Sequence, residues 1–401
     1  MKIIHVTNVI APDKLGGLER YVRELAASFV TEGHEVVVIS KATTPCAPEK
    51  ESGEDGVLVR RHPSPPKSSR LFAIWYPFMV FSGVRRILRE EVSRSELANG
   101  STIIHAHFPV PTLALALLRI PFVYTFHAPV YRELVGERQG SYAMSRFGER
   151  MAVLGMKAAE RFVLKRARVV LTLSDFTARE ARELGVPSRK IRVVPGGLDE
   201  ARFAWHGTSD GPATDDDGGR GPRLFAARRF VERTGVEQLV EAMPAVREAV
   251  PHITLRLAGT GPREADIRAL IERLDLVGVV QLLGRISDEQ LVSEYTKATL
   301  SVTPTLYLEG FGLSTAESLS LGTPALVTPV GANPELVAGL SPSLLSDGTS
   351  PDALADALIR LLNDQQALEA LRRRLRSGFA AKWGWSNVVR QLNDVYEALL
   401  R

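Results

Sequence analysis

Short apolar runs alternate with amphipathic helical patterns along most of this chain. The run IIHVTNVI at residues 3–10 precedes a segment whose apolar positions recur at helical spacing, and this pairing repeats down the sequence. Strands that alternate with helices indicate an α/β fold with mostly parallel sheets covered by helices. Further runs typical of strands lie at residues 35–40, 57–62, 102–107, 121–127, 168–174 and 191–195, and then at 223–228, 253–259, 279–284, 299–305, 325–330 and 343–345.

The alternation is interrupted at residues 207–222. This stretch, GTSDGPATDDDGGRGP, has no bulky apolar residue and is typical of a linker or loop. We therefore predict an N-terminal Rossmann-like domain over residues 1–200 and a C-terminal one over 201–380. Residues 381–401 are predicted to form an amphipathic helix that crosses back to the first domain. Two such domains would face a central cleft at the carboxyl ends of their strands, where ligands bind in this class of fold.

Composition narrows the class of protein. The chain has 401 residues, of which 45% are hydrophobic and 24% charged, as in soluble globular proteins of about two domains. Its single cysteine, Cys46, excludes an internal disulfide and a cysteine-based metal site. Basic residues are scattered and not interleaved with aromatic ones, which argues against nucleic acid as a partner.

Charge and hydropathy bear on location. Residues 1–200 hold 29 Lys and Arg against 21 Asp and Glu, and the remainder holds 21 against 25. The longest apolar run, residues 71–84, is too short to span a bilayer and contains Pro77. Residues 2–10 are too short for a secretory signal and lack its cleavage pattern, so we expect none. We expect a cytoplasmic protein, and the basic residues after this run leave open a weak peripheral contact at the inner membrane face.

The sequence EGFGLSTAE at residues 309–317 carries the clearest chemical signal. A buried strand is predicted before it and a helix begins within it, so a glycine turn lies at a helix N-terminus, which suits a phosphate. Gly310 and Gly312 would allow backbone amides to approach a ligand closely. Glu309 and Glu317 can accept hydrogen bonds from sugar hydroxyls, with Glu317 placed for a vicinal diol. The stretch predicts a receptor for a nucleotide-sugar.

Other turns at predicted strand ends point to the same ligand. Arginine is well suited to a diphosphate because its guanidinium is planar and always charged, and a cluster of arginines, Arg228, Arg229 and Arg233, follows a strand of the second half. No G-x-G-x-x-G follows the first strand, which argues against a dinucleotide-dependent oxidoreductase. The aspartates at 215–217 lie in low-complexity sequence, so we expect no metal site and no cofactor. Glycine or arginine also occupies the turns at Gly16, Gly17, Gly259, Gly261 and Arg285.

These motifs occur together in one known family. The segment EGFGLSTAESLSLGTPALVTPVGANPEL, together with GGLERYVREL, TIIHAHF, FHA, LTLSDFTARE, VVPGGLDEARF, RRFVERTG and LAGTGPRE, resembles the family-four glycosyltransferases in nearly end-to-end order. This is a retaining group with the two-domain GT-B fold, and the Glu–seven–Glu element is its signature.

The resemblance implies a role for each matching residue. Glu309 would contact hydroxyls of the transferred sugar, Glu317 the ribose, and Arg229 the diphosphate. His127 matches a family histidine beside the reacting sugar, while His105 and His107 are expected to be structural. Backbone amides would hold the sugar and diphosphate at Gly310, Phe311, Gly312 and Leu313, and Gly17 would approach the phosphates from the first domain.

Two departures from the family pattern affect these expectations. The family usually has a lysine at the position of Thr234, and Arg233 is predicted to supply that charge from one residue earlier. The usual asparagine of the interdomain turn is Gly196 here. Neither departure changes the expected fold.

The resemblance implies transfer of a hexose from a nucleoside-diphosphate sugar, with UDP favoured over GDP or TDP, to a hydroxyl acceptor. Anomeric configuration would be retained without metal, because Arg229, Arg233 and helix N-termini stabilise the leaving diphosphate. The acceptor, a glycan, a lipid-linked sugar or a small natural product, stays open. Residues 128–150 are expected to contribute to its site. The alternatives are a UDP-sugar epimerase of the same fold and a non-catalytic nucleotide-sugar-binding protein.

Overall fold

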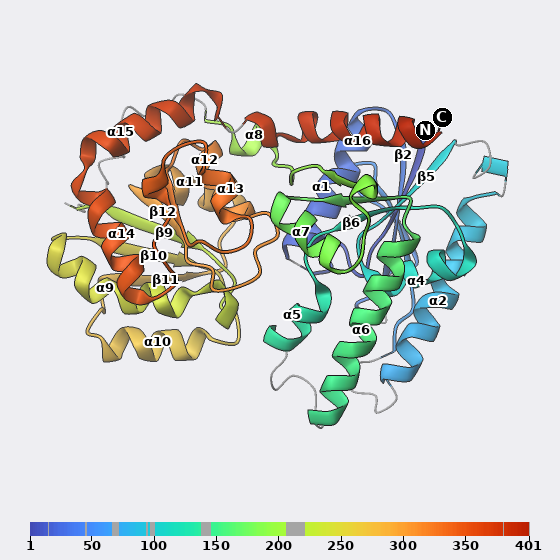
Figure 1. Cartoon of the computed structure of the whole chain (residues 1–401), viewed down its shortest axis with the longest axis horizontal. Coiled ribbons are helices and arrows are strands. Elements are labelled where there is room, and N and C mark those ends of the chain that lie inside the picture. Colours follow the sequence, from blue (N-terminus) through green and yellow to red (C-terminus); the bar gives the residue numbers. More distant parts are fainter. Residues whose placement is uncertain are drawn as a thin grey trace. The chain divides into compact units, whose positions relative to one another are not determined.

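The computed structural model divides the chain into two compact units, each built around its own sheet (Figure 1). Unit 1 comprises Met1–Gly197 and Trp385–Arg401, and unit 2 comprises Leu198–Gly384. The structure describes residues 1–14, 16–44, 46–65, 72–93, 95–96, 101–137, 146–205, 221–379 and 381–400. Most of the linker predicted at 207–222, including the three aspartates, lies outside the described residues.

Unit 1 contains an eight-stranded sheet in the order β3-β4-β2-β1-β5-β6-β7-β8. All neighbours pair in parallel except β3, which is antiparallel to β4. The short polar strand β3 was not predicted, because its sequence KES has no apolar alternation. The strands are β1 (Lys2–Val6), β2 (Glu35–Lys41), β3 (Lys50–Ser52), β4 (Leu58–His62), β5 (Thr102–Ala106), β6 (Val123–Phe126), β7 (Val169–Thr172) and β8 (Ile191–Val193).

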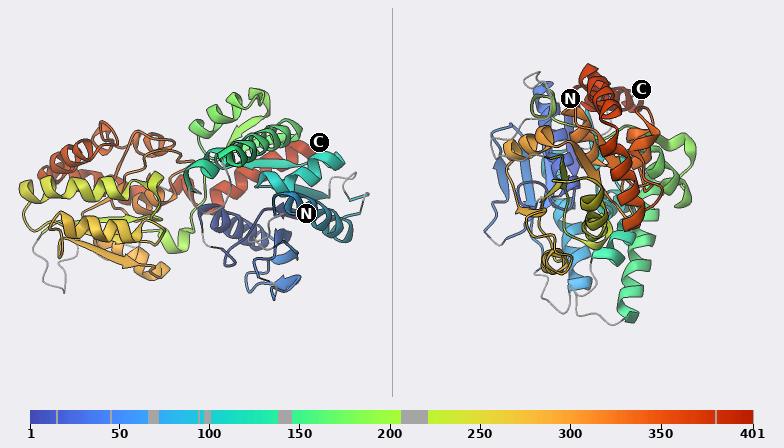
Figure 2. Two further views of the ribbon diagram at one scale, coloured as in Figure 1. Left: turned by 90° about the horizontal axis from the view of Figure 1, so that it is seen from below. Right: turned by 90° about the vertical axis from the view of Figure 1, so that its left-hand side faces the viewer.

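Helices cover both faces of this sheet (Figures 1 and 2). Helices α2 (Phe72–Glu91), α4 (Pro109–Leu118) and α6 (Arg146–Arg166) pack side by side on one face, with α5 (Val130–Glu137) against α6. Helix α1 (Gly17–Thr31) packs against the C-terminal helix α16 (Trp385–Leu400) on the other. Helix α7 (Asp175–Glu183) contacts β7 and β8, and a 3₁₀ turn spans Ser188–Lys190.

The C-terminal helix α16 belongs structurally to unit 1. Its residues Val388, Val389 and Leu392 are buried, each with at most 1% of its surface exposed. The indole of Trp385 donates a 3.0 Å hydrogen bond to Glu24 of α1. The chain therefore leaves unit 1 after Gly197 and returns to it at Trp385.

Unit 2 contains a parallel five-stranded sheet in the order β11-β10-β9-β12-β13. The strands are β9 (Arg223–Ala227), β10 (Thr254–Ala258), β11 (Val280–Gly284), β12 (Leu300–Thr303) and β13 (Ala325–Val327). The apolar run at 343–345 forms no further strand. A 3₁₀ turn covers Pro342–Leu344, and only Leu345 bridges to Val327.

Two layers of helices also enclose the unit 2 sheet. Helices α9 (Val236–Ala249), α10 (Glu264–Arg273) and α14 (Pro351–Asn363) pack together on one face, and α11 (Asp288–Lys297) and α12 (Leu313–Ser320) lie on the other (Figure 1). The remaining helical segments are α8 (Glu200–Phe203), α13 (Asn333–Val337), α15 (Gln365–Arg374), Glu232–Thr234, Leu375–Phe379 and Ala381–Trp383.

Because the strands within each sheet are parallel, the loops that follow them meet at one edge. In unit 2 the loops after β9, β10 and β11 are joined by backbone hydrogen bonds such as Phe230 N–H to Thr260 O (3.0 Å) and Gly259 N–H to Gly284 O (2.7 Å). The Leu306 amide likewise donates to Arg233 O at 2.8 Å. In the described part of the chain, no helix is both long enough and apolar enough to cross a membrane.

Candidate functional site

The Glu309 side chain is held from two directions. It lies in the loop between β12 and α12, where Arg228 Nη2 donates to its Oε2 at 2.9 Å and the hydroxyl of Thr305 donates to the same oxygen at 3.1 Å. Burial opposes ionisation of this carboxyl, but the charges of Arg228 and Arg233 outweigh it and lower its pKa. Glu309 is therefore an oriented carboxylate, able to accept a hydrogen bond from a ligand hydroxyl.

The turn after Glu309 fixes the start of α12. Gly312 precedes the helix with φ 89°, a left-handed conformation that favours glycine, and a Cβ there would meet Leu336 Cδ1 at 2.7 Å. Phe311 is buried and packs edge-on against Trp383, with ring centroids 6.4 Å apart. Leu313 is the first helical residue. The predicted glycine turn at a helix N-terminus is present, with Gly310 at its beginning.

Glu317 lies in α12 and is only 3% exposed. The Tyr295 hydroxyl, on α11, lies 3.0 Å from Ser314 O and 3.4 Å from Glu317 Oε2, so its single proton is shared between these two acceptors. Burial raises the pKa of Tyr295 well above its usual value, and the Glu317 charge adds to the effect. Tyr295 thus remains a neutral donor that orients Glu317.

The three arginines after β9 differ in their surroundings. Arg228, with a side chain only 7% exposed, forms the ion pair with Glu309. Arg229 is exposed. Arg233 donates from Nη1 to Leu308 O at 3.2 Å, so its side chain lies at the loop of Glu309. The contact of Arg228 was missed, because two adjacent arginines at a strand end give no pattern that separates their directions.

Thr234 occupies the position where the family usually has lysine. It is buried, and its hydroxyl lies 2.7 Å from the carbonyl oxygens of both Arg229 and Val231, which share its single proton. Its side chain therefore shapes the arginine loop from inside and adds no charge to it.

Two of the predicted ligand glycines have a structural reason to be glycine. A Cβ on Gly259, which has φ 135°, would lie 1.8 Å from Arg228 O, and one on Gly261 would lie 2.2 Å from Phe230 O. Both glycines allow the loop after β10 to pack on the arginine loop. This packing positions the arginines whether or not the glycine amides also touch a ligand.

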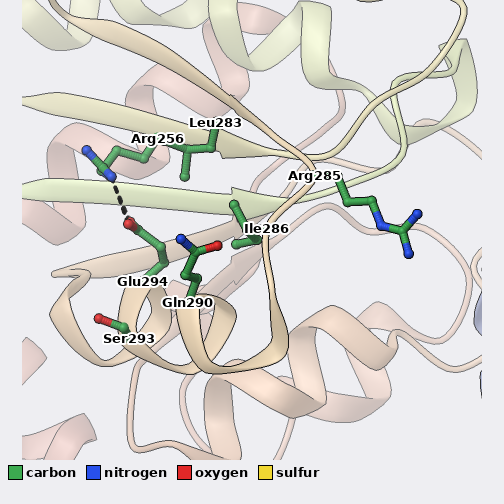
Figure 3. A pocket seen from close by; sticks show the side chains of 7 residues that line it. All are labelled: Arg256, Leu283, Arg285, Ile286, Gln290, Ser293 and Glu294. Atoms are coloured by element: carbon green, nitrogen blue, oxygen red, sulfur yellow. Dashed lines mark hydrogen bonds and ion pairs between the residues drawn. The ribbon is translucent and has the colours of Figure 1, made fainter.

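Arg285 follows β11 and lines a cavity of about 270 Å³ beside α11 (Figure 3). In the figure its guanidinium points away from the paired Arg256 and Glu294, whose closest atoms are 2.7 Å apart. Arg228, Glu309 and Glu317 are not among the described residues that line this cavity. The other lining residues are Leu283, Ile286, Gln290 and Ser293.

In unit 1, the predicted glycines lie at the start of α1. Gly16 is the N-cap residue, and a Cβ on it would meet the Glu19 carboxylate at 2.3 Å. A Cβ on Gly17, in contrast, would meet no atom within 4 Å among the described residues. Space beside this helix N-terminus is consistent with an anionic ligand.

His127 follows β6 and is partly exposed. Its Nε2 lies 3.4 Å from Nδ1 of His107, and the ring of Tyr21 packs edge-on against it at 4.9 Å. Burial lowers the pKa of His127, so its imidazole is neutral at pH 7. His105 and His107 are fully buried behind it.

Two family models match consecutive parts of the chain. The model of Glycosyltransferase Family 4 matches residues 15–202, and that of Glycosyl transferases group 1 matches residues 218–378. The chain is a family-four glycosyltransferase of the GT-B fold. This confirms the predicted fold class and family.

Known glycosyltransferases resemble the chain over its whole length. A glycogen synthase of Mycobacterium tuberculosis (strain CDC 1551 / Oshkosh) is 26% identical over 417 residues, which cover 100% of this chain and 95% of the relative. Sucrose-phosphate synthase from Thermosynechococcus elongatus has the same fold, with a TM-score of 0.76, 23% identity and coverage of 100% and 99%. Anabaena Alr3699/HepE in complex with UDP-glucose has a TM-score of 0.75, 17% identity and coverage of 99% and 100%.

Within this glycosyltransferase, the structure brings Glu309 and Arg233 together and places Glu317 one helix turn beyond the glycine loop. It adds Thr305 and Tyr295, which the sequence did not single out. It also pairs Arg228 with Glu309, whereas the sequence marked Arg228 only as a member of the arginine cluster. Among the described residues, one cluster of potential metal ligands is close enough to hold an ion. It is formed by His5, His105 and His107 in unit 1.

Proposed function

We propose that this glycosyltransferase moves a hexose from a UDP-linked donor to a hydroxyl acceptor, with retention of anomeric configuration and without a metal ion. The observation that carries the proposal is the Glu309 carboxylate, fixed by Arg228 and Thr305 beside a glycine turn and a helix N-terminus. A neutral carboxyl would donate as well as accept, whereas this ionised one accepts only and is matched to sugar hydroxyls.

Different residues of unit 2 bind the different parts of the donor. Glu317, oriented by Tyr295, accepts hydrogen bonds from the ribose diol. Arg229 and Arg233 neutralise the diphosphate as the sugar–phosphate bond breaks, and amides of Gly310, Phe311, Gly312 and Leu313 assist them. The family resemblance assigns Gly17 of unit 1 to the phosphates and His127 to the transferred sugar.

In the proposed reaction, the acceptor hydroxyl attacks the anomeric carbon on the face from which the diphosphate departs. The bond from the anomeric carbon to the diphosphate oxygen breaks, and the acceptor proton passes to the leaving phosphate. No carboxylate is needed as a nucleophile, in contrast to retaining glycosidases. UDP is favoured as the nucleotide, and the fold shared with a protein crystallised with UDP-glucose supports that choice.

A donor-consumption assay tests this proposal. The full-length chain is incubated with UDP-glucose, UDP-galactose, GDP-mannose or ADP-glucose, with and without a panel of sugar acceptors, in the presence and absence of EDTA. We expect nucleoside diphosphate release from a UDP-sugar, an acceptor-dependent increase, and no effect of EDTA. Proton NMR of the product should show the donor's anomeric configuration.

Three outcomes would contradict parts of the proposal. Conversion of the donor into its epimer would favour an epimerase, and binding without turnover of any donor would favour a non-catalytic protein. Loss of the rate with EDTA and its return with Mn²⁺ or Mg²⁺ would overturn the metal-free mechanism.

We also propose a cytoplasmic enzyme with a weak contact to anionic membranes through α2. Trp75 and Phe78 are 49% and 62% exposed on this helix, and Arg85 and Arg89 are exposed further along it. Co-sedimentation with vesicles containing anionic lipid should exceed that with neutral vesicles and fall on Trp75→Ser with Phe78→Ser. Equal sedimentation with both vesicle types would contradict it.

A further inference from the structure

Four histidines form a connected group toward the carboxyl ends of the central strands of the unit 1 sheet. His5 and His105 are paired residues in the adjacent strands β1 and β5, while His107 and His127 lie just after β5 and β6. The neighbours Ile4 and Val6 belong to the core cluster that packs under α2, α4 and α6. Because side chains alternate along a strand, His5 points to the opposite face, where it contacts Phe29 of α1.

Three of these rings, His5, His107 and His127, are linked in series, and we call this series the histidine chain. His5 Nδ1 lies 2.9 Å from His107 Nε2, and His107 Nδ1 lies 3.4 Å from His127 Nε2. The partly exposed His127 is thus connected through His107 to a ring with no exposed surface. The Nδ1 atom of the partly exposed His127 has no hydrogen-bond partner among the described residues, so this nitrogen is the end of the histidine chain that is left for a ligand.

Burial keeps the rings of the histidine chain uncharged. It lowers the pKa of His5 and of His127 to about 3, and it lowers that of His107 well below the usual value. A neutral imidazole has one N–H and one lone pair. Consequently, once one ring donates in a given direction, its neighbours must donate in the same direction.

The buried end of the histidine chain, at His5, determines the direction in which its rings donate. His5 Nε2 is buried and has no hydrogen-bond partner among the described residues. If the chain ran inward from His127, this nitrogen would be a buried N–H without an acceptor. For backbone groups, unpaired buried N–H donors are rarer than under-satisfied acceptors, and the same preference favours a lone pair at this nitrogen.

His105 is held separately. Its Nδ1 lies 2.6 Å from the hydroxyl of Tyr396 on α16, and its Nε2 lies 2.6 Å from Thr125 Oγ1. Both nitrogens therefore have partners outside the His5–His107 pair. The 2.9 Å separation within that pair is a hydrogen-bond distance, so a hydrogen-bonded chain accounts for the cluster without a shared ion.

We propose that His107, itself oriented by His5, is a positioning residue that holds His127 in the Nδ1–H tautomer. His5 Nδ1–H donates to His107 Nε2, and His107 Nδ1–H donates to His127 Nε2. His127 then presents an N–H donor to an oxygen of the transferred sugar and does not act as a base. The role on sugar rests on the proposed function, whereas the tautomer does not.

Long-range ¹H–¹⁵N NMR of histidine-labelled full-length protein tests the tautomer directly. We expect His127 to be the Nδ1–H form at pH 7, while the exposed ring of His252 serves as an internal reference. A His127 ring in the Nε2–H form, or a charged one, would overturn the proposal. Stoichiometric zinc that displaces the His5–His107 hydrogen bond would also overturn it.

Two variants of His107 provide matched controls. In His107→Asn the amide can replace Nδ1 and still donate to His127, whereas in His107→Gln it replaces Nε2 and loses that contact. We expect His107→Asn to keep the His127 tautomer and His107→Gln to shift it. Glutamine should also lower kcat for UDP-glucose consumption about tenfold, the size of one lost hydrogen bond, with KM nearly unchanged.

The two readouts separate the two proposals. If UDP-glucose is not turned over, the proposed function fails and the tautomer result still stands. If the enzyme is active but both variants leave the tautomer of His127 and kcat unchanged, the positioning role of His107 is wrong. Parallel loss of kcat and of folded protein in both variants would likewise assign His107 a purely structural role.

Discussion

The candidate site residues of the two units differ in their electrical state. In unit 1 they are neutral histidines joined in a chain, of which only His127 is partly exposed, and burial lowers their pKa values. In unit 2 they are arginines and glutamates, and the charges of Arg228 and Arg233 keep Glu309 ionised despite its burial. This difference matches the proposed roles, in which unit 2 balances the charge of a donor and unit 1 offers uncharged hydrogen-bond donors.

Acid should therefore weaken unit 1 before unit 2, and this is the largest effect expected. The pKa of His5 is 6.5 in the unfolded chain and about 3 in the fold, so its contribution to stability is complete above pH 6.5 and is lost as pH falls below it. Between pH 6.5 and 5 the protonation of His5 alone should remove about 2 kcal/mol, since one pH unit corresponds to about 1.4 kcal/mol. The lowered pKa values of His105, His107 and His127 act in the same direction, so the loss for the whole group is larger. The lowered pKa of Glu309 has its effect only below the ordinary carboxyl range.

One group in unit 1 acts in the opposite sense. Burial raises the pKa of Glu160 from 4.5 to about 8, so the contribution of this carboxyl to the stability of the fold decreases as pH rises. When pH falls, Glu160 therefore partly offsets the loss of stability caused by the histidines. Urea unfolding followed by hydrogen-exchange mass spectrometry, which reports the peptides of each unit separately, measures the balance. Equal losses in both units between pH 7 and 5, or a greater loss in unit 2, would contradict the comparison.

The next largest effect should come from the Arg228–Glu309 pair. Arg228→Ala leaves a largely buried carboxylate without its main partner, which typically costs about 3–5 kcal/mol. The exposed neighbour Arg229 is the matched control, and Arg229→Ala should change the free energy of unfolding by less than about 1 kcal/mol. Urea denaturation of both variants measures this. Similar values for the two would mean that the ion pair does not hold the loop.

A smaller effect is expected from the two arginines proposed to bind the diphosphate. Arg229→Ala and Arg233→Ala should each lower kcat for UDP-glucose consumption, and the double variant should lose less than the product of the two factors, because both neutralise one leaving group. Steady-state kinetics of the three variants tests this. Unchanged kinetics in Arg233→Ala would show that its contact with Leu308 O is only structural.

The fold and the donor loop follow directly from local sequence. The glycine turn, the buried strand before it and α12 after it were all predicted, because Gly312 and the apolar run specify them without distant contacts. The pairing of Arg228 with Glu309 was not, because it depends on how two loops 81 residues apart meet at one sheet edge.

The histidine chain shows the same limit. The pattern HAH after a predicted strand indicated structural histidines, but the sequence does not show that β1 and β5 pair in a register that sets His5 beside His105. Nor does it show that the hydroxyl of Tyr396, 291 positions after His105, lies within hydrogen-bond distance of the His105 ring. Strand register and long-range closure are properties of the assembled sheet.

The most direct test of the central claim is the affinity for UDP, measured by titration calorimetry on the wild type and on Glu317→Ala, Glu309→Ala and His127→Ala. The ribose is present in UDP and the transferred sugar is not, so only Glu317→Ala should weaken binding, by about tenfold or more, since hydrogen bonds to a charged group contribute about 1.5–3 kcal/mol. Glu309→Ala and His127→Ala should retain wild-type affinity for UDP and lose turnover. Equal loss of UDP affinity in all three variants, or no binding of UDP by the wild type, would contradict the account.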